Sequence, residues 1–496
     1  MSEDGAPSVA AKASFAAAVF ALAVAAIFAL ERVGAPDRLV AALGPLAGVA
    51  GVAALGVLTR AKTLLEFLVA RRSVPPFYAG LALAAPIGGF ALAFAGATTD
   101  PTRLPWRGVT AGIVIAVLMA APHWRAAQAS ALADVFATRY PAVFTRAAFA
   151  LMLSVCGWAL AATGLGYAAL TLSTSLGLSA DAALALAAAA LVASLAPGGL
   201  RSLVWTDAAS AGAGFATLSL LVALSVRDGA DNAARLEAAS RALGGLPGAP
   251  LVQEIAAAAA VASLFAFVSP ALAVATPAAA RRAGATALGV LGLGGVLAAA
   301  LGDLATKNPR DSSLAALIAC LPALALARAG LYASSRALGL DLLRAPKRLF
   351  VLGSRRMASA RGGVLIGAGA SAAIARLSPH PSAPLYLALA LWLAFATPSL
   401  VLSALPGRGA APASAALVAS LIAAFVGRFA GFGDPGYGPG LLVGGLAAGM
   451  VGLAAGLAAF ALAPPVAATP RLADPYVELP GEPSGSAESS IARAAS

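Results

Sequence analysis

The residues of this chain that could do chemistry lie at two interruptions in its apolar runs. One run contains Ala85-Pro86-Ile87-Gly88-Gly89, and a later one contains Phe267-Val268-Ser269-Pro270. A proline removes a backbone donor and collides with the preceding turn, whereas glycines add freedom and expose the backbone. Unpaired backbone groups at such points can bind a solute. We therefore predict a solute site formed by Ala85, Pro86, Gly88, Gly89, Val268, Ser269 and Pro270.

No set of side chains typical of catalysis or metal binding accompanies these interruptions. The chain has two cysteines and two histidines, too few for a disulfide framework or a metal-ligand pattern. No apolar run carries paired carboxylates, or a nucleophile beside a base. An enzyme is therefore the weakest interpretation, and we expect neither a cofactor nor a metal.

The composition indicates a membrane protein. Of 496 residues, 60% are hydrophobic and 11% are charged, and the mean hydropathy is +0.88. Apolar runs of about 20 residues match a bilayer core of about 30 Å, where the backbone must form helices. The formal net charge of +12 could suggest nucleic-acid binding, but the basic residues lie in short loops without interleaved aromatics. We predict an all-α polytopic membrane protein that binds no nucleic acid.

Hydropathy predicts fourteen spans. The first, preceded by an acidic leader, could be mistaken for a secretory signal, but we expect a true helix. The expected spans are 13–30, 39–58, 77–97, 108–122, 147–170, 180–196, 205–225, 251–276, 284–302, 312–335, 359–376, 383–404, 411–428 and 441–463.

The distribution of Lys and Arg gives an independent prediction of how the chain is oriented in the membrane. With the N-terminus in the cytoplasm, 21 Lys and Arg fall in cytoplasmic segments, 11 in external segments and one within a span. This asymmetry follows the positive-inside rule. We therefore expect a multi-pass protein of the cell (inner) membrane with both termini cytoplasmic: a short tail over 1–12, a transporter domain over 13–463 and a disordered tail over 464–496. The oligomeric state is left open.

The two interruptions stand five spans apart, in the third and eighth spans. Interrupted helices at corresponding positions are typical of inverted-repeat transporters. This placement predicts core repeats over 77–225 and 251–404, with both interrupted spans broken. The alternative is an ordinary kink at each proline, since membrane helices tolerate them.

Three segments resemble the sodium:solute symporter family. The clearest is residues 198–207 (GGLRSLVWTD), and the others are residues 67–77 (FLVARRSVPPF) and 133–140 (ADVFATRY). Along the chain the three follow the same order as in the family. The resemblance covers residues ~39–430, and the extra leading helix is most similar to the acetate-permease branch. It implies the five-plus-five inverted-repeat transporter fold, with spans three to twelve as its core and extra helices flanking it.

The chain departs from that family at the sodium ligands. Family members hold sodium with hydroxyl and carboxylate groups of the first core helix and a Ser/Thr pair in the eighth. Residues 79–92 and 314–332 contain no Ser or Thr, and the tenth span instead carries Arg328. An arginine within a span costs at least about 2.5 kcal/mol unless it is paired or hydrated. One hypothesis is that its guanidinium replaces the sodium and donates to carbonyls freed at the Pro86 interruption; the other is that Arg328 snorkels to the interface.

These features favour a secondary transporter for a small polar or anionic solute, working by alternating access with a degenerate sodium site. Thr397 and Pro398 are a possible gating hinge in the twelfth span, or an ordinary kink there. The alternative function is a transporter-like membrane sensor or regulator that moves no solute. The sequence names neither the solute nor any coupling ion.

Overall fold

The protein was analysed as a computed structural model, which describes residues 9–96, 104–126, 143–227, 231–245, 249–301, 309–342, 353–403, 411–429 and 439–462. Within these ranges the regular structure is entirely helical. Of the N-terminal tail predicted over 1–12, residues 9–12 belong to the first helix and residues 1–8 lie outside the described residues, as does the tail predicted over 464–496. The elements are α1 (Val9–Arg32), α2 (Asp37–Leu58), α3 (Leu64–Val69), η1 (Ala70–Arg72), α4 (Pro76–Ala95), α5 (Trp106–Ile115), η3 (Ala116–Ala120), α6 (Ala121–Ala126), α8 (Val143–Leu176), α9 (Ala180–Leu195), α10 (Gly199–Arg227), α11 (Asn232–Gly245), α12 (Leu251–Ser263), α13 (Phe265–Val268), η4 (Ser269–Ala273), α14 (Pro277–Leu301), α15 (Pro309–Arg336), η5 (Ala337–Leu342), α16 (Gly353–Leu377), α17 (Ala383–Ser403), α18 (Ala411–Phe429) and α19 (Pro439–Leu462).

Each of the fourteen predicted spans coincides with a helix or helix pair in the described part of the chain. Ten are long and apolar enough to cross a membrane, and the bent pair Leu251–Ser263 and Ala266–Ala273 gives an eleventh. The remaining three coincide with shorter apolar helices, Ala180–Leu195, Ala383–Phe395 and Pro412–Ala424. The prediction of a polytopic all-α membrane protein is confirmed.

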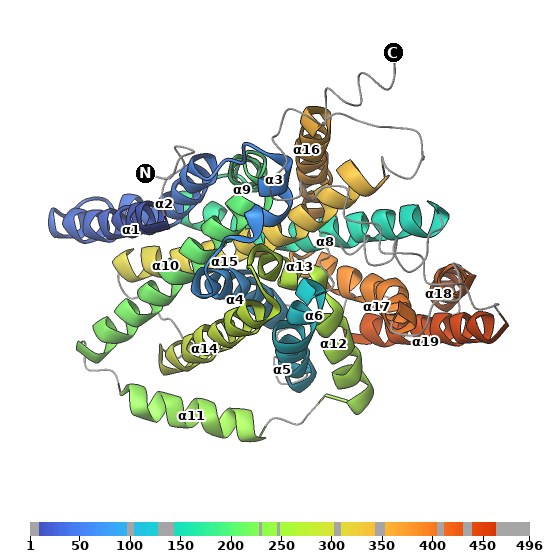
Figure 1. Ribbon diagram of the computed structural model, residues 1–496. Coiled ribbons are helices and arrows are strands. Elements are labelled where there is room, and N and C mark those ends of the chain that lie inside the picture. The colour runs from blue at the N-terminus through green and yellow to red at the C-terminus, as the bar shows by residue number, and fades with distance from the viewer. Residues whose placement is uncertain are drawn as a thin grey trace, which may run out of the picture.

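Helix α15 lies at the centre of the bundle and packs against α8, α4, α2 and α10 (Figure 1). Small residues let these helices approach closely, as is common in membrane bundles. At the crossing of α8 and α15, a side-chain carbon added to Gly157 would lie 2.6 Å from the Gly330 carbonyl oxygen, and one on Gly330 would lie 2.6 Å from that of Gly157. α2 approaches at Gly44, whose N–H donates to Ser313 Oγ at 2.9 Å.

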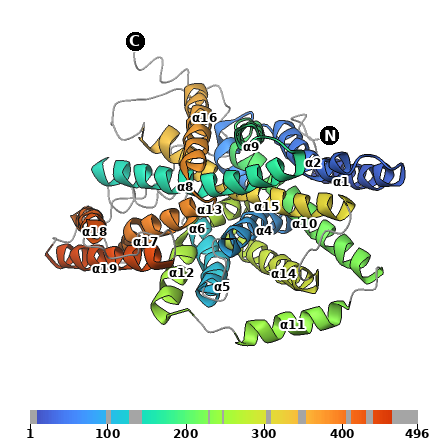
Figure 2. The same ribbon diagram turned by 180° about the vertical axis from the view of Figure 1, so that it is seen from behind.

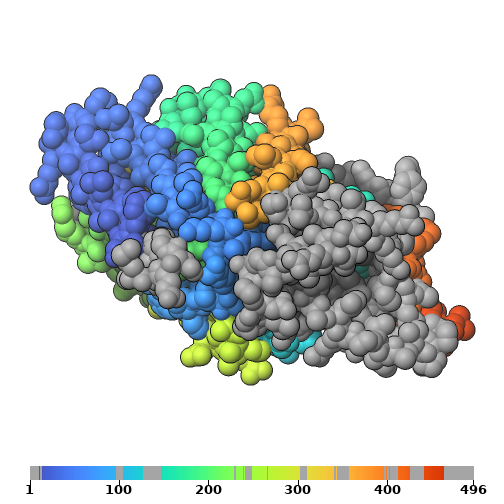
Figure 3. All heavy atoms as spheres, turned by 45° about the horizontal axis from the view of Figure 1, so that its top comes forward, coloured from blue at the N-terminus to red at the C-terminus, as the bar shows by residue number. Residues whose placement is uncertain are grey.

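The first and last helices form opposite edges around this centre. α1 and α2 lie on one side and α17, α18 and α19 on the other, in views from front and back (Figure 2). The space-filling view shows the same separation (Figure 3). α4, α10, α13 and α15 therefore occupy the interior, where a transport site is expected.

The prediction that the third span is broken at Pro86 is wrong. α4 is one continuous helix from Pro76 to Ala95 with Pro86 inside it. A proline removes only one intrahelical hydrogen bond, and packing on both sides of α4 holds the helix together across that loss. Ala85, Pro86 and Gly89 are all buried in that packing.

The eighth span is broken as predicted, but at a different residue. α12 ends at Ser263, and the next residue, Leu264, is extended with a ψ of 101°. The following short helices turn away by 46°. Pro270 lies in the first turn of η4. Ser269 Oγ donates to the Ala266 carbonyl at 3.1 Å. The buried hydroxyl of Ser269 is therefore bonded within its own turn.

Candidate functional site

Arg328 and Asp207 form an ion pair inside the bundle. Arg328 Nε lies 2.7 Å from Asp207 Oδ1, and Nη2 lies 2.6 Å from the same oxygen. Both side chains have 0% exposure. Nη2 also donates to Ser210 Oγ at 3.0 Å, so α10 supplies both partners. The pair joins α10 to α15 in the core of the protein.

The depth of the two residues explains why they pair. Asp207 lies eight residues after Gly199, where α10 begins, and Arg328 lies eight residues before Arg336, where α15 ends. At 1.5 Å per residue each lies about 12 Å from its helix end, beyond the reach of one arginine side chain. A buried charge at that depth needs a partner.

Both hypotheses for Arg328 are therefore wrong in their geometry. The guanidinium neither snorkels to an interface nor donates to carbonyls near Pro86, because α4 has no break there. Its contacts go instead to the aspartate that ends the GGLRSLVWTD segment. Because α10 begins at Gly199, six residues before the predicted start, Asp207 lies within the span rather than near its edge.

Gly88 and Gly89 of the predicted solute site face α15 rather than an open cavity. A side-chain carbon on Gly89 would overlap the Pro322 carbonyl oxygen, whereas one on Gly88 would lie 4.0 Å from Pro322 Cβ. Gly89 therefore allows α4 to approach α15 closely, a use of small residues common in membrane helices. Gly88 has room for a side-chain carbon at the same contact.

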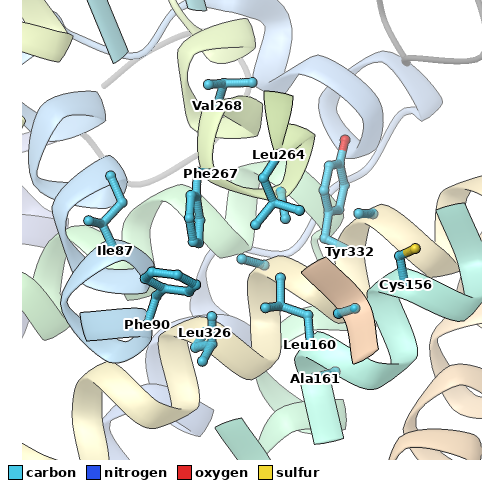
Figure 4. Close-up of a cluster of buried hydrophobic side chains, with 14 of the residues drawn as sticks. Ile87, Phe90, Cys156, Leu160, Ala161, Leu264, Phe267, Val268, Leu326 and Tyr332 are labelled. Carbon is cyan, nitrogen blue, oxygen red and sulfur yellow. The ribbon is translucent and has the colours of Figure 1, made fainter. Parts of the chain in front are cut away.

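The second half of the predicted site does lie beside α4. α13 and η4 both contact α4, and Val268, Ser269 and Pro270 are all buried. Figure 4 shows Phe267 projecting between Ile87 and Leu264 toward Phe90. The Phe90 and Phe267 rings meet edge to face with centroids 5.2 Å apart. Apolar side chains therefore fill the contact between α4 and α13 in this conformation.

A second charged cluster lies where α3 packs against α10. Glu66 is 4% exposed, and its carboxylate contacts Arg71 at 3.0 Å and Arg201 at 2.7 Å. The same carboxylate accepts the Lys62 backbone N–H at 2.7 Å. Burial alone raises the pKa of Glu66, but the Lys62 N–H and the two arginines outweigh it, so the pKa lies below its ordinary value.

The backbone after α3 is held in an unusual conformation. Ala70, Arg71 and Arg72 have φ of 51°, 53° and 54°, the left-handed region that costs energy for residues other than glycine. Tyr332 of α15 donates its hydroxyl to the Leu68 carbonyl at 2.7 Å and fixes the preceding helix. Gly199 takes φ of 54°, and a side-chain carbon there would lie 2.5 Å from the Phe67 carbonyl oxygen. The family-like segments at 67–77 and 198–207 thus pack against each other at this end of the bundle.

Sequence reasoning missed Asp207 and Glu66 as site residues. Asp207 is the last residue of the segment at 198–207 and Glu66 directly precedes the segment at 67–77, and this position is the signal that could have found them. The third such segment, residues 133–140, lies outside the described residues. Thr397 and Pro398 both lie within α17, which is continuous. Pro398 is buried, and the hinge remains a prediction.

No family model matches the sequence, and no curated protein matches it either. A solved structure of a Na⁺-coupled sialic acid symporter, in a substrate-bound outward-open state, matches with a TM-score of 0.64 and 17% identity, over 88% of this chain and 99% of that one. The chain has the fold of a sodium-coupled symporter. This shared fold confirms the predicted fold class.

Proposed function

We propose that this chain is a secondary transporter that moves a small polar or anionic solute by alternating access, with no sodium bound beside Asp207. The observation that carries the proposal is the Arg328–Asp207 pair in the core of a symporter fold. An arginine stays protonated at physiological pH, so it neutralises the buried carboxylate permanently. Because the guanidinium is covalently attached to α15, it cannot move down a gradient as a bound sodium ion does. This site therefore cannot couple transport to a sodium gradient.

The proposed solute site lies between α4 and α13, where Phe90 meets Phe267. The bent junction of α12 and α13 presents helix ends whose backbone groups can contact a polar solute. Access to it requires Phe267 to separate from Phe90, since these rings fill the contact. Within this proposal we place the chain nearest the acetate and monocarboxylate permeases, in the cell (inner) membrane with both termini cytoplasmic.

One observation favours a second candidate, a transporter-like regulator that moves no solute. The α4–α13 contact is apolar, and the hydroxyl of Ser269 is already donated to Ala266. A polar solute would find few side-chain partners there. Such a protein would signal through a bound ligand or partner.

Uptake by the purified protein in proteoliposomes separates these candidates. The vesicles would be loaded with potassium salts only and offered radiolabelled short carboxylates, amino acids and sugars, with protein-free vesicles as the control. The proposal expects at least one solute to enter faster than in the control. Uptake that appears only when sodium is added would overturn the sodium-free mechanism. Absence of uptake with and without sodium would favour the regulator.

A further inference from the structure

The Arg328–Asp207 pair leaves one polar atom of each partner unused. Both close contacts converge on Asp207 Oδ1. Within the described chain no hydrogen-bond partner reaches Asp207 Oδ2 or Arg328 Nη1, although both atoms are buried. A parallel, two-point arrangement would use both oxygens and is the usual strong form of this pair. An ionised oxygen without a donor at this depth is costly.

The surroundings offer Oδ2 no other charge. Among the described residues, the titratable groups near the pair are Cys320 of α15, which interacts electrostatically with Arg328, and Tyr78 of α4, which lines the neighbouring hollow. On α10 itself, Arg201 is engaged by Glu66 of α3. The parts of α1, α2 and α4 that line the neighbouring hollow are apolar or aromatic.

Two hollows approach the pair from α1. A cavity of about 260 Å³ lies between α1, α2, α4 and α10, and its walls include Trp205, Ala208 and Ala209 on either side of Asp207 in sequence. A smaller one of about 60 Å³ reaches Ser210, which accepts a hydrogen bond from Arg328. Each hollow exceeds the roughly 10–15 Å³ that one water molecule needs, and the polar side chains on their otherwise apolar walls are Tyr78, Trp205 and Ser210. These hollows offer a route by which a proton can come close to the pair.

We propose that Asp207 binds and releases one proton during the transport cycle, making the proton the coupling ion. An O–H bond forms at Oδ2, while Oδ1 becomes the carbonyl oxygen and keeps a weaker hydrogen bond from Arg328. The charge of the pair rises from zero to +1, and it returns to zero when the proton leaves. A proton suits this site because it needs one oxygen, whereas a metal ion would meet the repulsion of the guanidinium.

Protonation has a mechanical consequence. It removes the charge attraction that ties α10 to α15. The two helices can then shift relative to each other, as alternating access requires. Buried carboxylates act as proton carriers in other membrane proteins for the same physical reason. This inference rests on the proposed function for its link to transport.

Infrared spectroscopy of protein labelled with ¹³C at the aspartate carboxyl tests the proton site without a known solute. Spectra would be compared between about pH 8 and about pH 5, a range in which an ordinary exposed aspartate stays ionised. We expect a band of a buried carboxylic acid at the lower pH in the unmutated protein and in Asp181→Asn. Asp181 is the matched control because it is 66% exposed and paired with Arg376 at the surface. The band should vanish in Asp207→Asn.

A band that persists in Asp207→Asn, or no band in the unmutated protein, overturns the proposal. If Asp207→Asn fails to fold, Asp207→Glu serves instead. The new glutamate carries no ¹³C, so the ¹³C-shifted carboxylic acid band should disappear in this variant too. Proteoliposomes containing a pH-sensitive dye then separate the two proposals. Sodium-free uptake without proton movement overturns the proton site and keeps the carrier. A protonated Asp207 without uptake of any solute supports the proton site and overturns the carrier.

Discussion

Arg328 of α15 and Asp207 of α10 are held together through a single carboxylate oxygen, with Nε at 2.7 Å and Nη2 at 2.6 Å. The two residues are 121 positions apart in sequence. The pair therefore links two helices that must move relative to each other in an alternating-access carrier. Arg328 thereby places a permanent cation beside the Asp207 carboxylate.

Removing one member of this pair should destabilise the protein strongly. Arg328→Ala leaves Asp207 buried without a counter-charge, at a cost of about 3–5 kcal/mol in the free energy of unfolding. Arg328→Lys should cost less because it keeps the charge. The measurement is the thermal unfolding temperature in detergent.

The double variant Arg328→Met with Asp207→Leu is the control for that prediction. It replaces both charges by apolar groups, so its stability should recover toward that of the unmutated protein. Equal loss in the single and double variants would mean that the side chains matter for shape rather than for charge.

Gly88 and Gly89 make a matched pair of substitutions on α4. Gly89→Ala should lower the free energy of unfolding by about 1–3 kcal/mol, because the new methyl group overlaps the Pro322 carbonyl. Gly88→Ala meets only Pro322 Cβ at 4.0 Å and should be nearly neutral or slightly stabilising. Thermal unfolding of the two variants under identical conditions checks this order. Equal effects of the two substitutions on the unfolding temperature would mean that Gly89 does not lie at the closest contact of α4 with α15.

The Glu66 cluster should make stability depend on acid. Because Arg201, Arg71 and the Lys62 N–H hold the pKa of Glu66 below its ordinary value of 4.5, its contribution is complete above that value and is lost as the pH falls below it. Glu66→Gln should lower the unfolding temperature near neutral pH and flatten its decline in acid. The exposed Glu237→Gln is the control and should leave the acid profile unchanged. Parallel acid profiles for the unmutated protein and Glu66→Gln would contradict this role.

The fold followed from the sequence because each helix carries its own local signal. A run of about 20 apolar residues predicts a span wherever it occurs, and every predicted span coincides with a helix. This local signal does not say whether the helix breaks at Pro86. Whether a proline ends a helix depends on its neighbours, and here Pro322 of α15 packs against Gly89 across the bundle. The break in the eighth span was predicted, yet its position at Leu264 was not.

The candidate site was harder to predict because it depends on pairs distant in sequence. Arg328 was identified alone, since an arginine within an apolar run is conspicuous. Its partner lay near the expected edge of another span, and the true start of α10 at Gly199 moves Asp207 inward. Glu66 and Arg201 were also separated in sequence, and only packing of α3 on α10 unites them.

The proposal that Arg328 stands in place of a sodium ion can be tested by the response of unfolding to sodium, without a known solute. An ion that binds the folded protein raises its unfolding temperature in a saturable way. The unmutated protein in detergent would be heated in sodium chloride and in potassium chloride of equal concentration. The account predicts the same unfolding temperature in both salts at every concentration. A saturable rise in sodium alone would contradict it.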